Sequence, residues 1–187
     1  TDLWRMSADG QQKALALTGR EPEGTLEDIF ARDGVIWLFD GVEYAPNLGF
    51  GVRTAEVSGA TAVIINVKKT HEERRTIRRA GMRATRFIPV VYATTEEILS
   101  KCNRKIVVAE DVGNKAPWET DLTGNLLIVV GAENAGVSRE VLDVASEIVR
   151  LPMPGFIPSY NLQVAVSALA IERLRQIEIV TQNDNTS

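Results

Sequence analysis

Cysteine and histidine are nearly absent from this chain of 187 residues, which holds one of each. The single cysteine, Cys102, excludes an internal disulfide and fits a protein of the reducing cytoplasm. With only His71 and Cys102 as nitrogen and sulfur ligands, the chain has too few for a zinc site, so we expect no metal. A catalytic triad that needs histidine would have to use His71 as its base.

Long apolar runs are absent too. The longest, Val35–Phe39 and Leu126–Val130, are far short of the roughly 20 residues that span a bilayer, so no membrane contact is expected. Apolar residues nevertheless make up 44% of the chain, too many for a disordered protein. A chain of this length buries roughly 70% of the surface that its unfolded form exposes. We therefore expect a compact domain with a proper core.

Positive charge is scarce overall, with a formal net charge of −4, but it is concentrated in one segment. Residues 68–86 hold eight basic and two acidic residues (net +6), and the rest of the chain 13 and 23 (net −10). The eight basic residues are Lys68, Lys69, Arg74, Arg75, Arg78, Arg79, Arg83 and Arg86. The spacing of the arginines predicts a stripe on one helix face, continued by Arg83. Such a stripe suits the phosphates of RNA, whereas the alternative is a solvated face partly neutralised by Glu72 and Glu73.

Strand and helix patterns alternate from Val35 to the end of the chain. β-rich runs occur at Val35–Phe39, Ala62–Val67, Phe87–Tyr92, Lys105–Val108, Leu126–Val130 and Glu147–Leu151. Segments with helical spacing occur at Leu48–Ser58, Glu72–Ala80, Thr95–Cys102, Ser138–Ala145 and Ser159–Ile179. This alternation is typical of an α/β fold with a mostly parallel sheet, flanked by helices and buried on both faces.

The two ends of the chain differ from this pattern. Residues 1–33 are polar, and Ser7 is predicted to cap a helix over Ala8–Leu17. Thr25–Asp28 resembles a capping box for a second helix. We therefore divide the chain into an N-terminal helical extension at 1–33, one domain at 34–180 and a flexible tail at 181–187.

Three loops follow predicted strands, and ligands of parallel α/β sheets bind outside the carboxyl ends of the strands. In the first loop, residues 40–53, Asn47 is the expected helix cap and Arg53 lies inside a helix whose small residues leave room for a ligand. The alternative is a glycine-containing helix packed on the sheet, with a surface arginine. In the second loop, Gly131–Gly136, Glu133 replaces the middle glycine of a dinucleotide fingerprint and would repel a pyrophosphate. That loop suits a cationic or zwitterionic ligand, or it is a plain turn before a helix capped by Ser138.

The third loop, Leu151–Leu162, contains three prolines and a glycine. Proline fixes the backbone, so this segment is expected to be rigid. Ser159 is predicted to cap the helix that follows, whose first turn would present free N–H groups beside the side chain of Asn161. Function and plain structure both remain open for this loop at this point.

Taken together, the loops resemble the three motifs of the SpoU (TrmH-like) RNA 2′-O-ribose methyltransferases of the SPOUT superfamily. The matching positions are Asn47…Arg53, then Gly131-x-Glu133-x-x-Gly136, then Leu151-Pro152-Met153-x-Gly155-x-x-x-Ser159-x-Asn161-x-x-Val164-Ala165. The resemblance covers about residues 34–175. The chain departs from the family at Tyr160, where leucine is usual, and at Ala109–Asp111, where the family often has a threonine.

The resemblance implies an α/β methyltransferase fold with a C-terminal trefoil knot, an exception to the rule that chains do not thread loops. It implies a homodimer that transfers a methyl group from S-adenosylmethionine to a ribose 2′-hydroxyl of tRNA or rRNA. The catalytic residues would be Arg53, Asn47, Glu133 and Asn161. The cofactor would be held by Ala109, Glu110, Gly131, Glu133, Gly136, Leu151, Met153, Ser159 and Asn161.

The RNA partner is less well defined by the resemblance. Many relatives carry a separate RNA-binding domain, so RNA capture would here rest on the basic segment, the extension at 1–33 and the dimer partner. Single-domain relatives often act on tRNA, which favours tRNA slightly. One alternative is an RNA-binding protein on the same scaffold without catalytic activity, against which Arg53, Glu133 and Asn161 count. Another is an α/β enzyme that uses a dinucleotide or a small acidic substrate, against which Glu133 and the missing Walker lysine count.

Overall fold

The computed structural model describes residues 7, 9–11, 13, 21–157 and 159–184. The strands of this part of the chain form one sheet in the order β3-β2-β1-β5-β4-β6, and every neighbouring pair is parallel. The strands are β1 (Val35–Asp40), β2 (Ala62–Ile65), β3 (Val90–Tyr92), β4 (Lys105–Ala109), β5 (Leu126–Gly131) and β6 (Glu147–Val149). The predicted parallel α/β sheet is confirmed.

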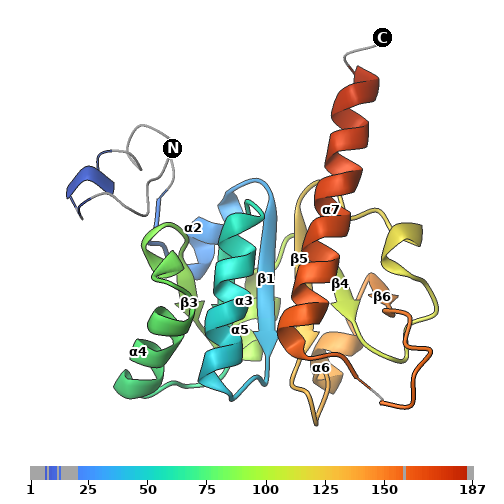
Figure 1. The fold of residues 1–187 in the computed structure, drawn as a ribbon, viewed down its shortest axis with the longest axis horizontal. Helices are drawn as coiled ribbons and strands as arrows, with labels where there is room; N and C mark the ends of the chain where they lie inside the picture. The colour runs from blue at the N-terminus through green and yellow to red at the C-terminus, as the bar shows by residue number, and fades with distance from the viewer. Residues whose placement is uncertain (1–6, 8, 12, 14–20, 158, 185–187) are drawn as a thin grey trace.

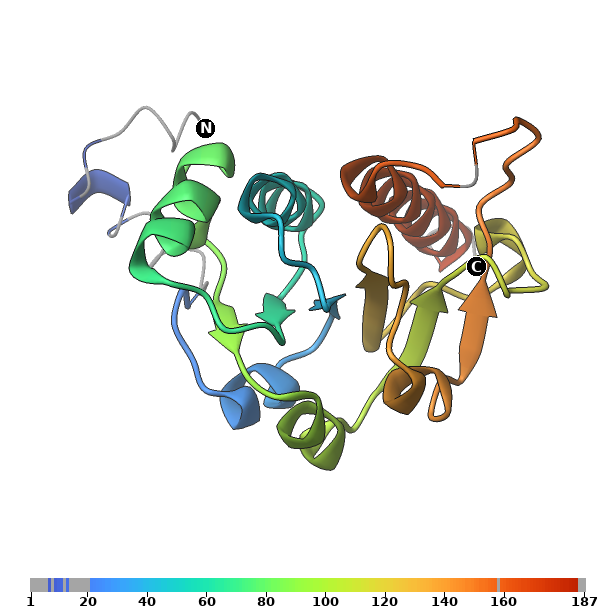
Figure 2. The ribbon, with the colours of Figure 1, turned by 90° about the horizontal axis from the view of Figure 1, so that it is seen from below.

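Helices cover both faces of the sheet (Figure 2). One face carries α3 (Ala45–Val57), α4 (His71–Ala80) and α7 (Leu162–Asp184), and the other carries α2 (Leu26–Ala31), α5 (Thr95–Lys101) and α6 (Arg139–Leu142). Successive strand residues point to opposite faces, so β1 supplies Trp37 and Phe39 to one apolar cluster and Ile36 and Leu38 to the other. Both faces of the sheet are therefore buried, which explains why β1 and β5 consist almost entirely of apolar residues.

The strand order places a ligand site at the middle of the sheet. Strands β1, β2 and β3 follow one another from the middle of the sheet to one edge. The chain then crosses to β4 on the other side of β1, and β5 lies between β1 and β4. Parallel sheets bind ligands at the carboxyl ends of strands next to such a reversal of order. The loops after β4 and β5 and the loop after β6 leave from that edge, and short 3-10 helices at Ala84–Arg86 and Pro117–Glu119 complete the connections.

Several predicted boundaries needed correction. Helix α3 begins at Ala45 instead of Leu48, because Pro46 occupies its first turn, where proline needs no N–H partner. Helix α7 continues to Asp184, so the tail expected from residue 181 is helical as far as the structure describes it. The capping box at Thr25 is confirmed, with Asp28 as its second member. The predicted helix over Ala8–Leu17 falls mostly outside the described residues.

The segment after β6 runs against the loop after β4. The Glu110 N–H donates to the Val149 carbonyl at 3.0 Å, and the Arg150 N–H donates to the Lys115 carbonyl at 2.8 Å. From there the chain reaches α7, whose C-terminal half extends past the end of the sheet (Figure 1). The trefoil knot that the resemblance implies stays a prediction.

One arginine attaches α2 to the sheet domain. Arg104, which directly precedes β4, donates to the carbonyls of Ile29, Phe30, Arg32 and Gly34 at the end of α2 and the start of β1. Its guanidinium carbon lies 5.9 Å from the centre of the Phe30 ring. Burial lowers the pKa of this guanidinium, so the carbonyl dipoles must offset its desolvation.

Replacing Arg104 by alanine should therefore destabilise the fold. Because four carbonyls lose a charged donor, we expect Arg104→Ala to lower the free energy of unfolding by about 2 kcal/mol in urea denaturation. Arg104→Lys should recover only part of this, since a lysine ammonium lacks the planar fork that reaches several carbonyls. An unchanged midpoint for Arg104→Ala would contradict this role.

Candidate functional site

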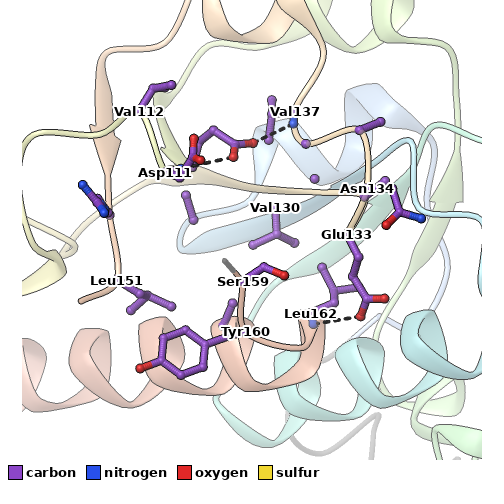
Figure 3. Close-up of a pocket in the computed structure, with 18 of the residues that line it drawn as sticks. Asp111, Val112, Val130, Glu133, Asn134, Val137, Leu151, Ser159, Tyr160 and Leu162 are labelled. Atoms are coloured by element: carbon purple, nitrogen blue, oxygen red, sulfur yellow. Dashed lines mark hydrogen bonds between the residues drawn. The ribbon is translucent and has the colours of Figure 1, made fainter. Parts of the chain in front are cut away.

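The carboxyl edge of the sheet holds a cavity of about 480 Å³ (Figure 3). Loops after β4, β5 and β6 and the start of α7 line it. Eight of the predicted cofactor residues are among them: Ala109, Glu110, Gly131, Glu133, Gly136, Leu151, Met153 and Ser159. Asn161 does not line the cavity, but it contacts Glu133, which does. Segments that are more than 40 residues apart in the sequence, from Ala109 to Ala165, therefore line one cavity.

Two glycines let the loop after β5 turn sharply back on itself. A Cβ on Gly131 would lie 2.2 Å from the carbonyl carbon of Gly136, and Gly136 itself has φ +67°. Only glycine accepts both conditions without strain. The loop is then fixed to its neighbour, because the Val137 N–H donates to the Glu110 carboxylate at 2.8 Å. The loops after β4 and β5 therefore form one continuous wall of the cavity.

The carboxylate of Glu133 connects this wall to two helices. One of its oxygens accepts hydrogen bonds from the Asn47 amide at 3.0 Å, the Asn161 amide at 3.1 Å and the Leu162 N–H at 3.3 Å. Asn47 belongs to the first turn of α3, and Leu162 is the first residue of α7. Glu133 therefore sets where both helices begin relative to the cavity.

Of three predicted helix caps, those at Asn47 and Ser159 are wrong and the one at Ser138 is confirmed. The residue that caps α3 is Tyr44, and the buried Asn47 side chain reaches across to Glu133 instead. At α7 the Asn161 side-chain oxygen, not Ser159, accepts from the Gln163 N–H at 3.0 Å. Ser138 is the N-cap residue of α6, although its side chain makes no capping bond, and its N–H donates to the buried Asp40 carboxylate at 2.6 Å. Asn47 therefore serves a contact with another segment instead of its own helix, whereas Asn161 and Ser138 do both.

The cavity is acidic. Its lining includes the carboxylates of Glu110, Asp111 and Glu133 and one guanidinium, that of Arg150. Apolar residues also line it, among them Leu151 and Val130, and Figure 3 shows Val130 between Asp111 and Glu133. An anionic ligand such as a pyrophosphate would be repelled, whereas a ligand with positive charge and an apolar ring would match both kinds of residue. The interpretation of Glu133 from the sequence therefore agrees with the electrostatics of the cavity.

Arg53 lies outside this cavity. Six residues after Asn47 on the same helix, it points about 240° around the helix axis from it. It is exposed and, with Phe50, Val57 and Gln163 of α7, borders a second hollow of about 360 Å³. The sequence reasoning grouped Asn47 with Arg53, but the structure directs one to Glu133 and the other to the outer surface of α3.

The basic segment forms an exposed surface with one exception. Lys68 and the four arginines of α4 are exposed, as are Arg83 and Arg86. Lys69 is not: its side chain is 1% exposed, its ammonium donates to the Glu43 carbonyl at 2.6 Å, and it pairs with Glu73 at 3.4 Å. The prediction that Lys69 contacts RNA is therefore wrong, because its buried ammonium binds the Glu43 carbonyl and fixes the loop before α4.

The arginines also depart from one continuous stripe. Helix α4 ends at Ala80, and Arg83 lies beyond it in the left-handed conformation, with φ 63°. Arg86 follows in a 3-10 turn and donates to the Gln11 side chain at 3.0 Å. Arg74 stacks over the ring of Tyr92 at 4.2 Å, and burial raises the pKa of that tyrosine. The stripe is thus limited to α4, with two further arginines beside it.

Some cavity residues were missed by the sequence reasoning. They include Asp111, Arg150, Tyr160 and Leu162. Each is a direct neighbour of a predicted residue, so extending every motif by one position would have found them. Outside the cavity, the contact of the buried Asp40 with the half-buried Asn66 had no such signal, because it joins the end of β1 to the residue after β2.

Comparison with known proteins was consistent with this geometry. The model of the SpoU rRNA Methylase family matches residues 34–171. The 23S rRNA (guanosine-2′-O-)-methyltransferase RlmB of Pseudomonas putida is 33% identical over 161 residues, covering 82% of this chain and 65% of the relative. An rRNA methyltransferase from Sinorhizobium meliloti, solved with bound AdoMet, superimposes with a TM-score of 0.75 at 26% identity, covering 82% of this chain and 60% of that one.

The chain belongs to the SpoU family of RNA methyltransferases. A structure concerned with 2′-OH methylation of C/U34 on tRNA shares the fold, with a TM-score of 0.70 at 22% identity over 77% of this chain and 96% of that one. The chain spans about 65% of the length of the curated relative from Pseudomonas putida. Within the described residues, no helix is long and apolar enough to cross a membrane.

The shared acceptor at Glu133 gives a prediction about stability. Glu133→Ala removes one acceptor from three donors, so we expect the free energy of unfolding to fall by about 1 to 2 kcal/mol. Glu133→Gln keeps a carbonyl oxygen at that place and should recover most of the loss. Thermal unfolding of the three proteins measures both effects. Equal stability of wild type and Glu133→Ala would show that the two helices do not depend on this carboxylate.

Proposed function

We propose that the chain transfers a methyl group from S-adenosylmethionine to a ribose 2′-hydroxyl of RNA, in the cytoplasm. The single observation that carries the proposal is the acidic cavity at the carboxyl ends of β4, β5 and β6, where the second and third family motifs meet. We take ribosomal RNA as the substrate class, because the curated relatives are named 23S rRNA (guanosine-2′-O-)-methyltransferases. This replaces the slight preference for tRNA that the sequence alone suggested.

The residues around the cavity fit this cofactor. Its sulfonium and amino groups are positive and match the carboxylates of Glu110, Asp111 and Glu133, while its adenine matches the apolar side chains of Val130 and Leu151. When bound, the cofactor would supply a methyl group on its sulfonium: the acceptor oxygen would bond to the methyl carbon as the S–C bond breaks, which leaves S-adenosylhomocysteine. We propose that the remaining predicted residues, Ala109, Gly131, Gly136, Met153 and Ser159, hold it through the loop backbone.

Positioning accounts for most of what the protein must do in such a transfer. We propose that Asn47 and Asn161 act by holding Glu133, which fixes the cofactor wall against α3 and α7. Arg53 is proposed to hold a phosphate beside the target ribose, because a guanidinium stays protonated near neutral pH and is a poor base. The proton of the 2′-hydroxyl would then pass to water or to another group.

We also propose that the chain acts as a homodimer through α3 and α7. Phe50 and Val57 are exposed seven residues apart on α3, and Val164 and Ile171 are exposed with the same spacing on α7. Seven residues return a side chain to the same helix face, so each helix presents an apolar strip to solvent. Arg53 lies beside the strip of α3, so the partner would cover the hollow that Arg53 borders.

RNA capture is proposed for the exposed basic surface of α4 and the neighbouring Lys68, Arg83 and Arg86. Guanidinium groups bind phosphates with two parallel hydrogen bonds, which supports affinity without sequence preference. A chain that binds RNA through this surface but transfers no methyl group is the alternative.

Methyl transfer from radiolabelled S-adenosylmethionine tests the proposal. The acceptor is total RNA from cells that lack the enzyme, separated by size and then digested to nucleosides. A 2′-O-methylated nucleoside in the rRNA fraction is expected. Label in tRNA alone would correct the substrate class, and RNA binding without label in any fraction would support the alternative.

Arg53→Ala gives the sharpest test of the catalytic assignment. Because Arg53 lies outside the cofactor cavity, its loss should leave S-adenosylhomocysteine affinity unchanged while kcat falls by about 100-fold or more. Arg53→Lys should recover little, since one ammonium does not reproduce the planar fork. Calorimetry and single-turnover kinetics separate the two effects. Near-normal turnover in Arg53→Ala would remove this residue from the mechanism.

Ile171→Asp should disrupt the proposed dimer. Ile171 is 66% exposed on α7, and a carboxylate there would be buried against the partner. We expect the dimer dissociation constant to rise at least about tenfold in sedimentation velocity. Val144→Asp, on an exposed residue beyond α6, is the matched control and should leave the dimer intact. A monomeric wild type would reject the dimer directly.

A further inference from the structure

The loop between β6 and α7 has two arms that both border the cofactor cavity. Leu151 and Met153 lie on the outgoing arm, and Ser159 and Tyr160 lie on the returning arm. Figure 3 shows Leu151 and Tyr160 on the same side of the cavity. The distance between the arms therefore sets the shape of this wall.

The composition of the loop limits what can hold the arms together. Residues 152, 154 and 158 are prolines, which have no N–H and cannot form backbone bonds across the loop as donors. Side-chain packing at the tip of the loop cannot hold the two arms together either, because Phe156 is fully exposed and Ile157 largely so. Proline stiffens each arm but does not join it to the other. A side-chain contact is the remaining means of closure among the described residues.

Tyr160 provides that contact. Its hydroxyl donates a hydrogen bond to the Pro152 carbonyl at 2.8 Å, eight residues back in the sequence. Pro152 lies between Leu151 and Met153, and Tyr160 follows Ser159, so this one bond joins the two pairs of lining residues.

We propose that the Tyr160 hydroxyl is a positioning group that holds the two arms of the loop at the spacing S-adenosylmethionine requires. The inference rests on the proposed function for the identity of the ligand. A loop already held in its binding shape loses less conformational freedom on binding, so affinity is higher. The hydroxyl is bonded to the protein itself, so its effect should appear in cofactor binding and not in the transfer step.

Tyr160→Phe isolates this hydroxyl, because it keeps the ring that lines the cavity. We expect its dissociation constant for S-adenosylhomocysteine, measured by calorimetry, to rise about 3- to 10-fold. KM for S-adenosylmethionine should rise in parallel while kcat and the melting temperature stay unchanged. Tyr44→Phe makes the same chemical change outside the loop and should alter neither constant.

Hydrogen exchange in the ligand-free protein gives a second readout. The amides of Met153, Gly155, Phe156 and Ile157 should exchange faster in Tyr160→Phe than in wild type. Equal affinity of the two proteins for S-adenosylhomocysteine would overturn the proposal. If the wild-type protein binds no S-adenosylhomocysteine, the proposed cofactor is wrong, and hydrogen exchange alone tests the loop contact. Faster exchange in Tyr160→Phe than in wild type then supports the contact, and equal exchange rejects it.

Discussion

The carboxylate of Glu133 accepts hydrogen bonds from Asn47 of α3 and from the neighbouring Asn161 and Leu162 at the start of α7, so it joins three segments that are far apart in the sequence: its own loop, α3 and α7. The rest of the site depends on this convergence. A parallel sheet brings the ends of its strands to one edge, but it does not fix the helices that start there. Glu133 does so through a side chain that also borders the cavity. Its charge therefore serves two purposes, since it holds neutral donors of the protein and favours a cationic ligand.

Much of the fold could be predicted because its signals are local. The apolar runs Val35–Phe39 and Leu126–Val130 became the two central strands, since only a sheet buried on both faces needs continuous apolar residues. The cavity could also be predicted in outline, because loops that follow parallel strands must meet at one edge. The negative character of its lining followed from Glu133, a carboxylate where a phosphate-binding loop needs glycine.

Side-chain direction could not be predicted in the same way. Asn47 is a residue type that often caps helices, yet its side chain contacts Glu133 instead. Ser138 does occupy the N-cap of α6, but nothing in the sequence indicated that its N–H also donates to Asp40, a contact that only the folded chain brings together. Lys69 counts as one more positive charge in the sequence, but the loop before α4 folds it inward onto a carbonyl. Arg53 and Asn47 share a helix and a motif, but helical geometry turns them to different surfaces. These outcomes depend on tertiary neighbours, which no local pattern contains.

The central claim is that the loops after β4, β5 and β6 form one cofactor site. Hydrogen exchange of the wild-type protein with and without S-adenosylmethionine tests it most directly, because it reports each loop separately. The account predicts protection on binding in three segments together, residues 109–113, 131–137 and 151–162, with little change in α2 or α5. Protection confined to one of these loops, or centred on the hollow beside Arg53, would contradict it.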